Sequence, residues 1–127
     1  MAVIQSRRGY SNLEPLIYDG GAGVTQISKQ LIEANTTGKE KIEEITLGHD
    51  DLGLNVEIRF KNHQPIVVSG FSWGYSGEGC RGLCWLFKRY YIPLDMMDIA
   101  KLDMNKSYAV KLVKSEYMDK KWEITEL

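Results

Sequence analysis

Four glycines gathered within nine residues constrain this chain more than any other feature of its sequence. They are Gly74, Gly77, Gly79 and Gly82. They follow the apolar run at 66–68 and precede a helix that the apolar spacing predicts over 81–91, with Pro93 ending it. Such a glycine density lets the backbone adopt positive φ and lets a ligand approach the main chain closely. Free N–H groups at the start of the helix would then suit a phosphate or another anion.

The residues in and beside these glycines form the candidate ligand-binding site. They are Phe71, Trp73, Gly74, Tyr75, Gly77, Glu78, Gly79, Arg81 and Trp85. The rings are suited to stacking on a base, which contributes about 1–3 kcal/mol per base, and Arg81 to holding a phosphate through two hydrogen bonds. Glu78 would repel an anion, but it is also suited to accepting hydrogen bonds from ribose hydroxyls, pairing with Arg81 or entering the first helical turn. The other interpretation is a glycine-rich turn that only packs tightly.

A second glycine cluster, at 20–23, also leads into a helix. Residues 16–18 are expected to form a short strand before it. Apolar residues from Val24 to Ile32 then recur at helical intervals, and Asn35 and Gly38 are suited to ending that helix. Two such loops are able to face one ligand; alternatively, one of them is a flexible turn.

Alternation of apolar and polar side chains predicts strands over much of the remaining chain. The expected strands are residues 41–47, 54–60 and 66–69, with turns at 48–51 and 61–64. Residues 94–103 are expected to form a short helix or an irregular connection. Residues 108–113 and 121–125 are expected to form a hairpin, although 106–118 also fits a helix. The prediction is a single α+β domain over residues 1–127, with an antiparallel sheet, two or three helices and a glycine-rich strand-to-helix loop.

Composition gives no sign of a nucleic-acid polymer or a membrane as partner. The net charge is −1, and the hydrophobic and charged fractions are 43% and 26%, as in an ordinary globular protein. No stretch approaches the roughly 20 apolar residues of a membrane span, and the first ten residues lack the apolar centre of a signal peptide. We therefore expect a cytoplasmic protein in which Cys80 and Cys84 are reduced, partly buried thiols.

No arrangement of residues predicts catalysis. The sequence contains no serine-elbow motif, no HExxH and no phosphate loop ending in GK[ST]. His49, Asp50 and Asp51 are adjacent, but aspartates favour turns through local hydrogen bonds, so a turn is a better interpretation than a metal site. We therefore expect no catalytic residue, no metal and no cofactor.

The run from Gly70 to Leu83 resembles a signature of small, mostly uncharacterised bacterial and phage proteins. In those proteins a Phe-x-Trp-Gly-Tyr-x-Gly-x-Gly-Pro segment precedes a helix; here Cys80 stands at the proline position. The ending at 121–127 is also similar to theirs, so that the resemblance covers about a third of the chain. The family has no settled activity to transfer. In size, loop and helix the chain also resembles phage anti-defence proteins of the Thoeris type, which bind nucleotide signals without cleaving them.

These observations predict non-catalytic binding of a small nucleotide-like anion at the glycine-rich loop. In a phage setting, this would sequester a cyclic nucleotide or ADP-ribose-type immune signal in the host cytoplasm. The alternative is a protein-interaction module that blocks a host protein through exposed aromatic residues; an enzyme acting on nucleotides is the third possibility. Apolar residues beyond the needs of a small core also predict a homo-oligomer, with the helix over 81–91 near the contact. They are Trp85, Tyr91, Met96, Met97 and Met104.

Overall fold

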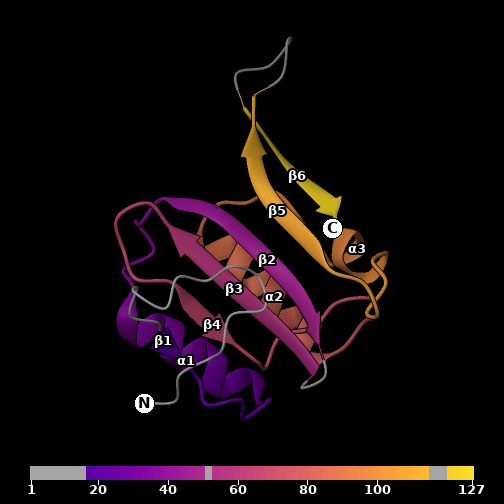
Figure 1. The fold of residues 1–127 in the computed structure, drawn as a ribbon, viewed down its shortest axis with the longest axis horizontal. Helices are drawn as coiled ribbons and strands as arrows, with labels where there is room; N and C mark the ends of the chain where they lie inside the picture. The colour runs from indigo at the N-terminus through magenta and orange to yellow at the C-terminus, as the bar shows by residue number, and fades with distance from the viewer. Residues whose placement is uncertain (1–16, 51–52, 115–119) are drawn as a thin grey trace.

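A computed structural model of the chain describes residues 17–50, 53–114 and 120–127 (Figure 1). Its elements are β1 (Ile17–Tyr18), α1 (Thr25–Asn35), β2 (Ile42–Asp50), β3 (Gly53–Phe60), β4 (Ile66–Val68), α2 (Glu78–Arg89), α3 (Met96–Ala100), β5 (Tyr108–Val113) and β6 (Lys121–Glu126). The strands form one six-stranded sheet in the order β1-β4-β3-β2-β5-β6. All neighbouring strands are antiparallel except β1 and β4, which are parallel. The predicted α+β class is confirmed.

The core lies between one face of this sheet and the helices. Alternate residues of β3, Val56, Ile58 and Phe60, are buried on that face, as their spacing predicts. Figure 1 shows α2 behind strands β2 to β4, and its buried side chains Leu83, Leu86 and Phe87 belong to the same cluster. Ile32 of α1 and Ile99 of α3 join this cluster from the other two helices. The opposite face of the sheet carries mostly polar side chains.

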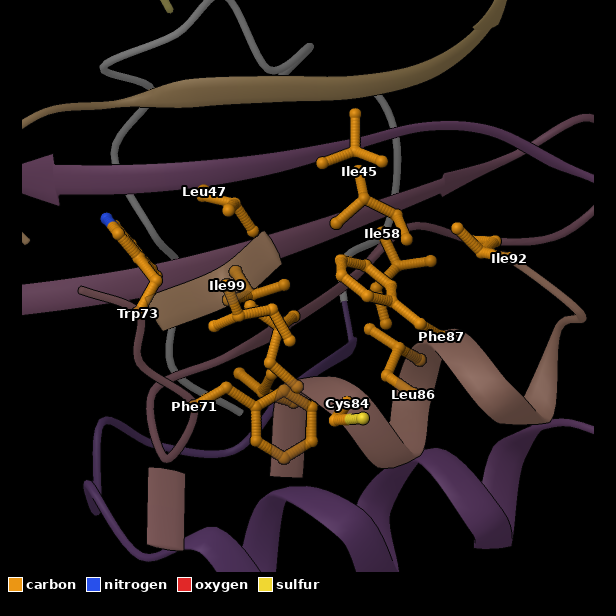
Figure 2. Packing of buried hydrophobic residues seen from close by; sticks show 14 of the residues in the cluster. Ile45, Leu47, Ile58, Phe71, Trp73, Cys84, Leu86, Phe87, Ile92 and Ile99 are labelled. Carbon is orange, nitrogen blue, oxygen red and sulfur yellow. The ribbon is translucent and has the colours of Figure 1, made fainter. Parts of the chain in front are cut away.

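Two aromatic side chains of the glycine-rich loop are part of this core. Phe71 and Trp73 are 1% and 0% exposed. Figure 2 shows them among the isoleucine and leucine side chains of the sheet and helices, with Phe87 in the same cluster. The loop between β4 and α2 is therefore anchored by burial of its own side chains, which fixes the path of the glycines that follow.

Two element boundaries differ from the prediction. Gly48, His49 and Asp50 were expected in a turn, but they belong to β2, because its register with β3 continues to the pair Asp50↔Gly53. Helix α2 begins at Glu78 rather than Arg81. Two of the four clustered glycines, Gly79 and Gly82, therefore lie inside a helix. Their missing side chains allow close packing there, as described below.

The other predicted elements are confirmed with small shifts in their bounds. The short strand before the second glycine cluster is β1, although residue 16 lies outside the described residues. The connection at 94–103 contains α3, which begins with a capping box between Asp95 and Asp98. The C-terminal hairpin is formed by β5 and β6, so the strand interpretation of residues 108–113 is correct. Cys80 and Cys84 are both free and buried.

Candidate functional site

The two glycine-rich loops meet at one edge of the sheet. The parallel strands β1 and β4 are neighbours, with Ile17 opposite Ile66 and Tyr18 opposite Val67. Because parallel strands end at the same edge, the loop at 19–24 and the loop at 69–77 both start there, and each leads into a helix. The carboxyl ends of adjacent parallel strands, followed by helices, are where open α/β sheets commonly bind ligands.

Asp19 joins the two loops. Its Oδ2 accepts hydrogen bonds from the Ser69 backbone N–H and the Ser28 hydroxyl, both at 2.7 Å. Its Oδ1 accepts from the Ser69 hydroxyl at 2.9 Å and from the Gly21 N–H at 3.1 Å. One carboxylate therefore holds the end of β4, the second glycine cluster and the first turns of α1 in a fixed arrangement.

Direct contacts between the loops complete this arrangement. The Gly23 N–H donates to the Ser69 hydroxyl at 2.9 Å, and the Thr25 hydroxyl donates to the Gly70 carbonyl at 2.7 Å. The Gly70 N–H donates to the Ser28 hydroxyl at 2.9 Å. A Cβ at Gly70 would overlap the backbone of Val24, so the close approach of the two loops requires glycine there.

A groove of about 260 Å³ lies between the loops, and we call it the glycine-loop groove. It is lined by Gly23, Thr25, Leu54, Ser69, Gly70, Phe71, Ser72, Tyr75 and Gly79. The first turns of α1 and α2 both border it. The N-cap residues are Val24 and Gly77, and in neither case does a side chain cap the helix. Backbone N–H groups at the positive ends of two helices are therefore not satisfied by N-cap side chains beside this groove.

The groove brings together three of the residues that the sequence predicted for the site. Tyr75 is 43% exposed and presents its ring, Gly79 lies in the first turn of α2, and Phe71 contributes to the lining although almost all of its side chain is buried. The Tyr75 hydroxyl accepts a hydrogen bond from the Ser72 hydroxyl at 3.0 Å. Tyr75 is therefore the exposed aromatic residue of the predicted set at the groove.

Trp73 and Gly74 do not line the groove and have a structural role. Trp73 is completely buried, and its Nε1–H donates to the carbonyls of Asp103 and Lys106 at 3.1 and 3.2 Å. Gly74 has a φ of +91° and lies against the backbone of Leu102, where a Cβ would come within 2.8 Å of the carbonyl oxygen. Both residues join the loop to the connection between α3 and β5.

The charged residues at the start of α2, Glu78 and Arg81, are not among the residues that line the groove. Glu78 and Arg81 are exposed, and within the described part of the chain they do not form an ion pair with each other. Gly77 precedes the helix, and a Cβ there would come 2.5 Å from Cε2 of Tyr75. Gly77 therefore leaves room for the Tyr75 ring in its observed position.

Trp85 lies apart from the glycine-loop groove. Its ring contacts Phe71 edge to face, with centroids 6.5 Å apart. It lines a different hollow, at the carboxyl-terminal half of α2. The structure thus separates Trp85 from Phe71, Tyr75 and Gly79, which line the groove.

Sequence reasoning missed the polar residues that build the groove. Asp19, Ser28 and Ser69 form its hydrogen-bonded frame, and Thr25 and Leu54 line it. The signal available for Asp19 was its position directly before three glycines in four residues. For Ser69 it was a polar residue directly after the buried strand β4.

The structure gives no support for metal chemistry in the described residues. Nowhere in residues 17–50, 53–114 and 120–127 do three or more His, Cys, Asp or Glu side chains gather in an arrangement able to hold a metal ion. Cys80 is buried, and its Sγ lies 3.6 Å from the Oγ of Ser72. Asp51 lies outside the described residues, and the neighbouring His49 is exposed on β2.

A larger hollow of about 680 Å³ lies on the polar face of the sheet. It is lined by Glu43, Glu44, Thr46, Glu57, Arg59, Lys111 and Leu127. Arg59 and Glu57 form an ion pair at 3.0 Å within it. With three carboxylates and two cations, the side chains that line it carry a net negative charge, which disfavours an anion.

Comparison with known proteins found no family model, no curated protein and no solved structure that matches the chain. In the part of the chain that the structure describes, no helix has the length and apolar character needed to cross a membrane.

Proposed function

We propose that this protein binds a small nucleotide-like anionic ligand at the glycine-loop groove, without catalysis. The observation that carries the proposal is the meeting of two helix N-termini, neither capped by an N-cap side chain, at one groove between two glycine-rich loops. Backbone N–H groups and helix dipoles at such a place favour an anionic group. The groove volume of about 260 Å³ suits one phosphate or carboxylate group with part of what it is attached to.

The ring of Tyr75 and the side chain of Arg81 extend the proposed site beyond the groove. Tyr75 offers a face on which a base or another flat group would stack. Arg81 is in the second turn of α2 and is exposed, and helical side chains lean toward the helix N-terminus. Its guanidinium would therefore reach the outer part of an anion held at the groove.

The chemistry of the lining favours binding over reaction. The described lining residues contribute hydroxyls, one phenol, backbone groups and apolar surface, with no carboxylate, imidazole, thiol or amine among them. A hydroxyl acts as a nucleophile only when an adjacent base activates it, and the carboxylate beside these hydroxyls, Asp19, already accepts four hydrogen bonds that hold the two loops together. This supports a protein that holds its ligand unchanged.

A sequestering role in the cytoplasm is the biological setting we propose. It rests on the resemblance of residues 70–83 to bacterial and phage proteins and on the general likeness to anti-defence proteins that withhold a cyclic nucleotide or ADP-ribose-type signal. In such a role the protein would return its ligand intact after denaturation, whereas an enzyme would return a product.

Exposed apolar side chains support the alternative of a protein-interaction module. Tyr91 is 88% exposed and Met97 is 73% exposed. We also propose that such surface mediates a homo-oligomer, with α2 near the contact. Sedimentation at micromolar concentration tests this, and a monomer there would contradict it.

Native mass spectrometry with ADP-ribose and with cyclic dinucleotides as probes tests the binding function. We expect one of these probes to be retained by the wild type and recovered with unchanged mass after heating. Tyr75→Ala should weaken retention by about tenfold through loss of stacking, while Tyr75→Phe, which keeps the ring, should bind nearly as the wild type does. Retention of neither probe would contradict the proposed function, and equal binding by Tyr75→Ala and the wild type would remove Tyr75 from the site.

A further inference from the structure

A hollow of about 480 Å³ at the carboxyl-terminal half of α2 combines cations with aromatic rings. It is lined by Thr37, Gly38, Lys39, Trp85, Lys88, Arg89 and Tyr91, and we call it the basic hollow. Its residues come from the connection after α1 and from α2 with the residue beyond its C-cap. It shares no lining residue with the glycine-loop groove.

The cations of this hollow are not neutralised by carboxylates. Within residues 17–50, 53–114 and 120–127, neither Lys39 nor Lys88 nor Arg89 forms an ion pair. The nearby acid, Glu40, is occupied: its carboxylate accepts from the N–H groups of Thr37 and Gly38, the Thr37 hydroxyl and the Tyr90 hydroxyl. The hollow therefore has a local excess of positive charge in a protein whose net charge is −1.

The guanidinium of Arg89 is held in position by Thr36. Its Nη2 donates to the carbonyl and the hydroxyl of Thr36, at 3.0 and 2.9 Å. Its Nε is buried and has no hydrogen-bond partner in the described chain. A buried donor without a partner is costly, so the fold holds this guanidinium in place at some cost.

Trp85 gives the hollow a flat, electron-rich surface. Its ring is supported by Phe71, and the Nζ of Lys29 and the Cζ of Arg89 lie 5.2 and 5.8 Å from its centroid. These cation–π contacts place positive charge over the ring. A flat group that stacks near Trp85 would lie within reach of those cations.

Tyr91 has a backbone conformation that the fold alone would assign to glycine. Its φ is +57°, in the left-handed region, and it follows the C-cap residue Tyr90 of α2. The Ile92 N–H donates to the Phe87 carbonyl at 2.8 Å, the closing bond of a Schellman motif, in which glycine is preferred at the position of Tyr91. A tyrosine there is strained, yet its ring is 88% exposed and contributes almost nothing to the core.

We propose that the basic hollow is a second ligand site, which binds a phosphate-bearing small molecule with a flat ring, the chemistry of a nucleotide. Lys39, Lys88 and Arg89 would hold the phosphate, and the rings of Trp85 and Tyr91 would hold the flat group. The volume lies within the usual range of small-molecule sites, about 300–1,000 Å³. Favourable charge at a helix C-terminus explains Lys88 and Arg89 alone. It explains neither Lys39 nor the strained, exposed Tyr91.

Titration calorimetry with adenosine monophosphate, adenosine and inorganic phosphate tests the proposal, with the indole N–H signal of Trp85 followed by NMR. We expect adenosine monophosphate to bind at least about tenfold more tightly than adenosine or inorganic phosphate. It should also shift the indole N–H signal of Trp85, which is assigned by its absence from the spectrum of Trp85→Phe. Absence of any shift at millimolar monophosphate would overturn the site. Much tighter binding of a ten-nucleotide single strand than of the monophosphate would overturn the ligand class.

Two sets of variants separate the site from general charge and from folding. Lys39→Gln with Lys88→Gln should weaken monophosphate binding by about tenfold or more, whereas Lys101→Gln with Lys121→Gln, which changes the net charge equally, should not. Equal weakening by both pairs would overturn the proposal.

Tyr91→Gly should raise the midpoint of thermal unfolding and weaken binding, and unchanged binding would remove Tyr91 from the site. Tyr75→Ala should leave this site unaffected, so failure here and failure at the glycine-loop groove are distinguishable.

Discussion

Asp19 and Ser69 lie fifty positions apart in the chain and are joined by two hydrogen bonds, from the Ser69 N–H to Oδ2 at 2.7 Å and from the Ser69 hydroxyl to Oδ1 at 2.9 Å. Each serine donor therefore meets its own carboxylate oxygen. Because Asp19 directly follows β1 and Ser69 directly follows β4, this pair aligns the two loops that begin there. The Asp19 carboxylate thus works together with the direct hydrogen bonds between the loops to position the walls of the glycine-loop groove.

Asp19→Ala is expected to destabilise the protein strongly. It removes a charged acceptor from donors on Gly21, Ser28 and Ser69, several of them partly buried. Hydrogen bonds to charged groups contribute about 1.5–3 kcal/mol each and are not additive, so we expect a loss of about 2–4 kcal/mol in the free energy of unfolding. Urea denaturation measures it. Asp103→Ala is the control: its Oδ1 accepts one exposed N–H, from Asn105, and the loss should be about 1 kcal/mol or less.

Gly82→Ala is expected to destabilise the protein even though alanine favours helices. A Cβ at this position would lie 2.6 Å from Cδ1 of Phe71 and 2.6 Å from Cγ2 of Thr25. Overpacking of this kind costs about 1–3 kcal/mol, more than the gain of about 1 kcal/mol in helix propensity. Adding Thr25→Ser removes one of the two obstacles while keeping the hydroxyl that donates to Gly70, and it should restore part of the stability. If Gly82→Ala alone is as stable as the wild type, α1 and α2 move apart at little cost.

Arg81→Ala tests whether the exposed guanidinium reaches the ligand at the glycine-loop groove. If it does, affinity for the bound probe should fall by about 10- to 100-fold, and Arg81→Lys should recover only part of it because an ammonium lacks the planar fork. Thermal unfolding should barely change, since Arg81 is exposed and has no ion pair within the described residues. An unchanged dissociation constant would remove Arg81 from the site.

Low pH should destabilise the connection between α1 and β2, because it protonates the carboxylate of Glu40. Partial burial raises the pKa of this carboxyl, but hydrogen bonds from Thr37, the backbone and Tyr90 outweigh it and lower the pKa from 4.5 to about 2. The folded state therefore binds the proton less readily than the unfolded chain. The stabilisation is fully present above pH 4.5 and is lost as the pH falls toward 2.

The pH dependence of urea denaturation between 4.5 and 2 checks this expectation. Glu40→Gln should flatten the curve in that window and lower stability at neutral pH. Tyr90→Phe removes one of the donors and should flatten the curve less. A wild-type slope retained by Glu40→Gln would assign the acid sensitivity to other carboxyls.

The sequence predicted the sheet and helices because their side chains repeat at regular intervals. The alternation from Leu54 to Phe60 and the helical spacing before Pro93 report burial directly. The helix start was harder to find, because Gly79 and Gly82 signal a loop by composition but serve close packing inside α2. Helix propensity is a weak signal when tertiary contacts require a missing side chain.

The candidate site was predicted only in part because its members come from distant segments. Phe71, Tyr75 and Gly79 lie in one stretch and were found together. Their partners Asp19 and Thr25 become neighbours only through the pairing of β1 with β4, which no local pattern reports. Trp85 is close to the glycines in sequence, but its position on α2 directs it to the basic hollow instead.

The parallel pairing of β1 with β4 has a consequence for the order of folding. Strands β2, β3 and β4 are joined by short connections and pair with their sequence neighbours, whereas β1 must close a loop from Ile17 to Ile66 across α1 and two strands. Such long-range closure costs more chain entropy and is slower than local pairing. We therefore expect the glycine-loop groove to form after strands β2 to β4 have paired, so that a nascent chain would assemble the centre of its sheet before its ability to bind.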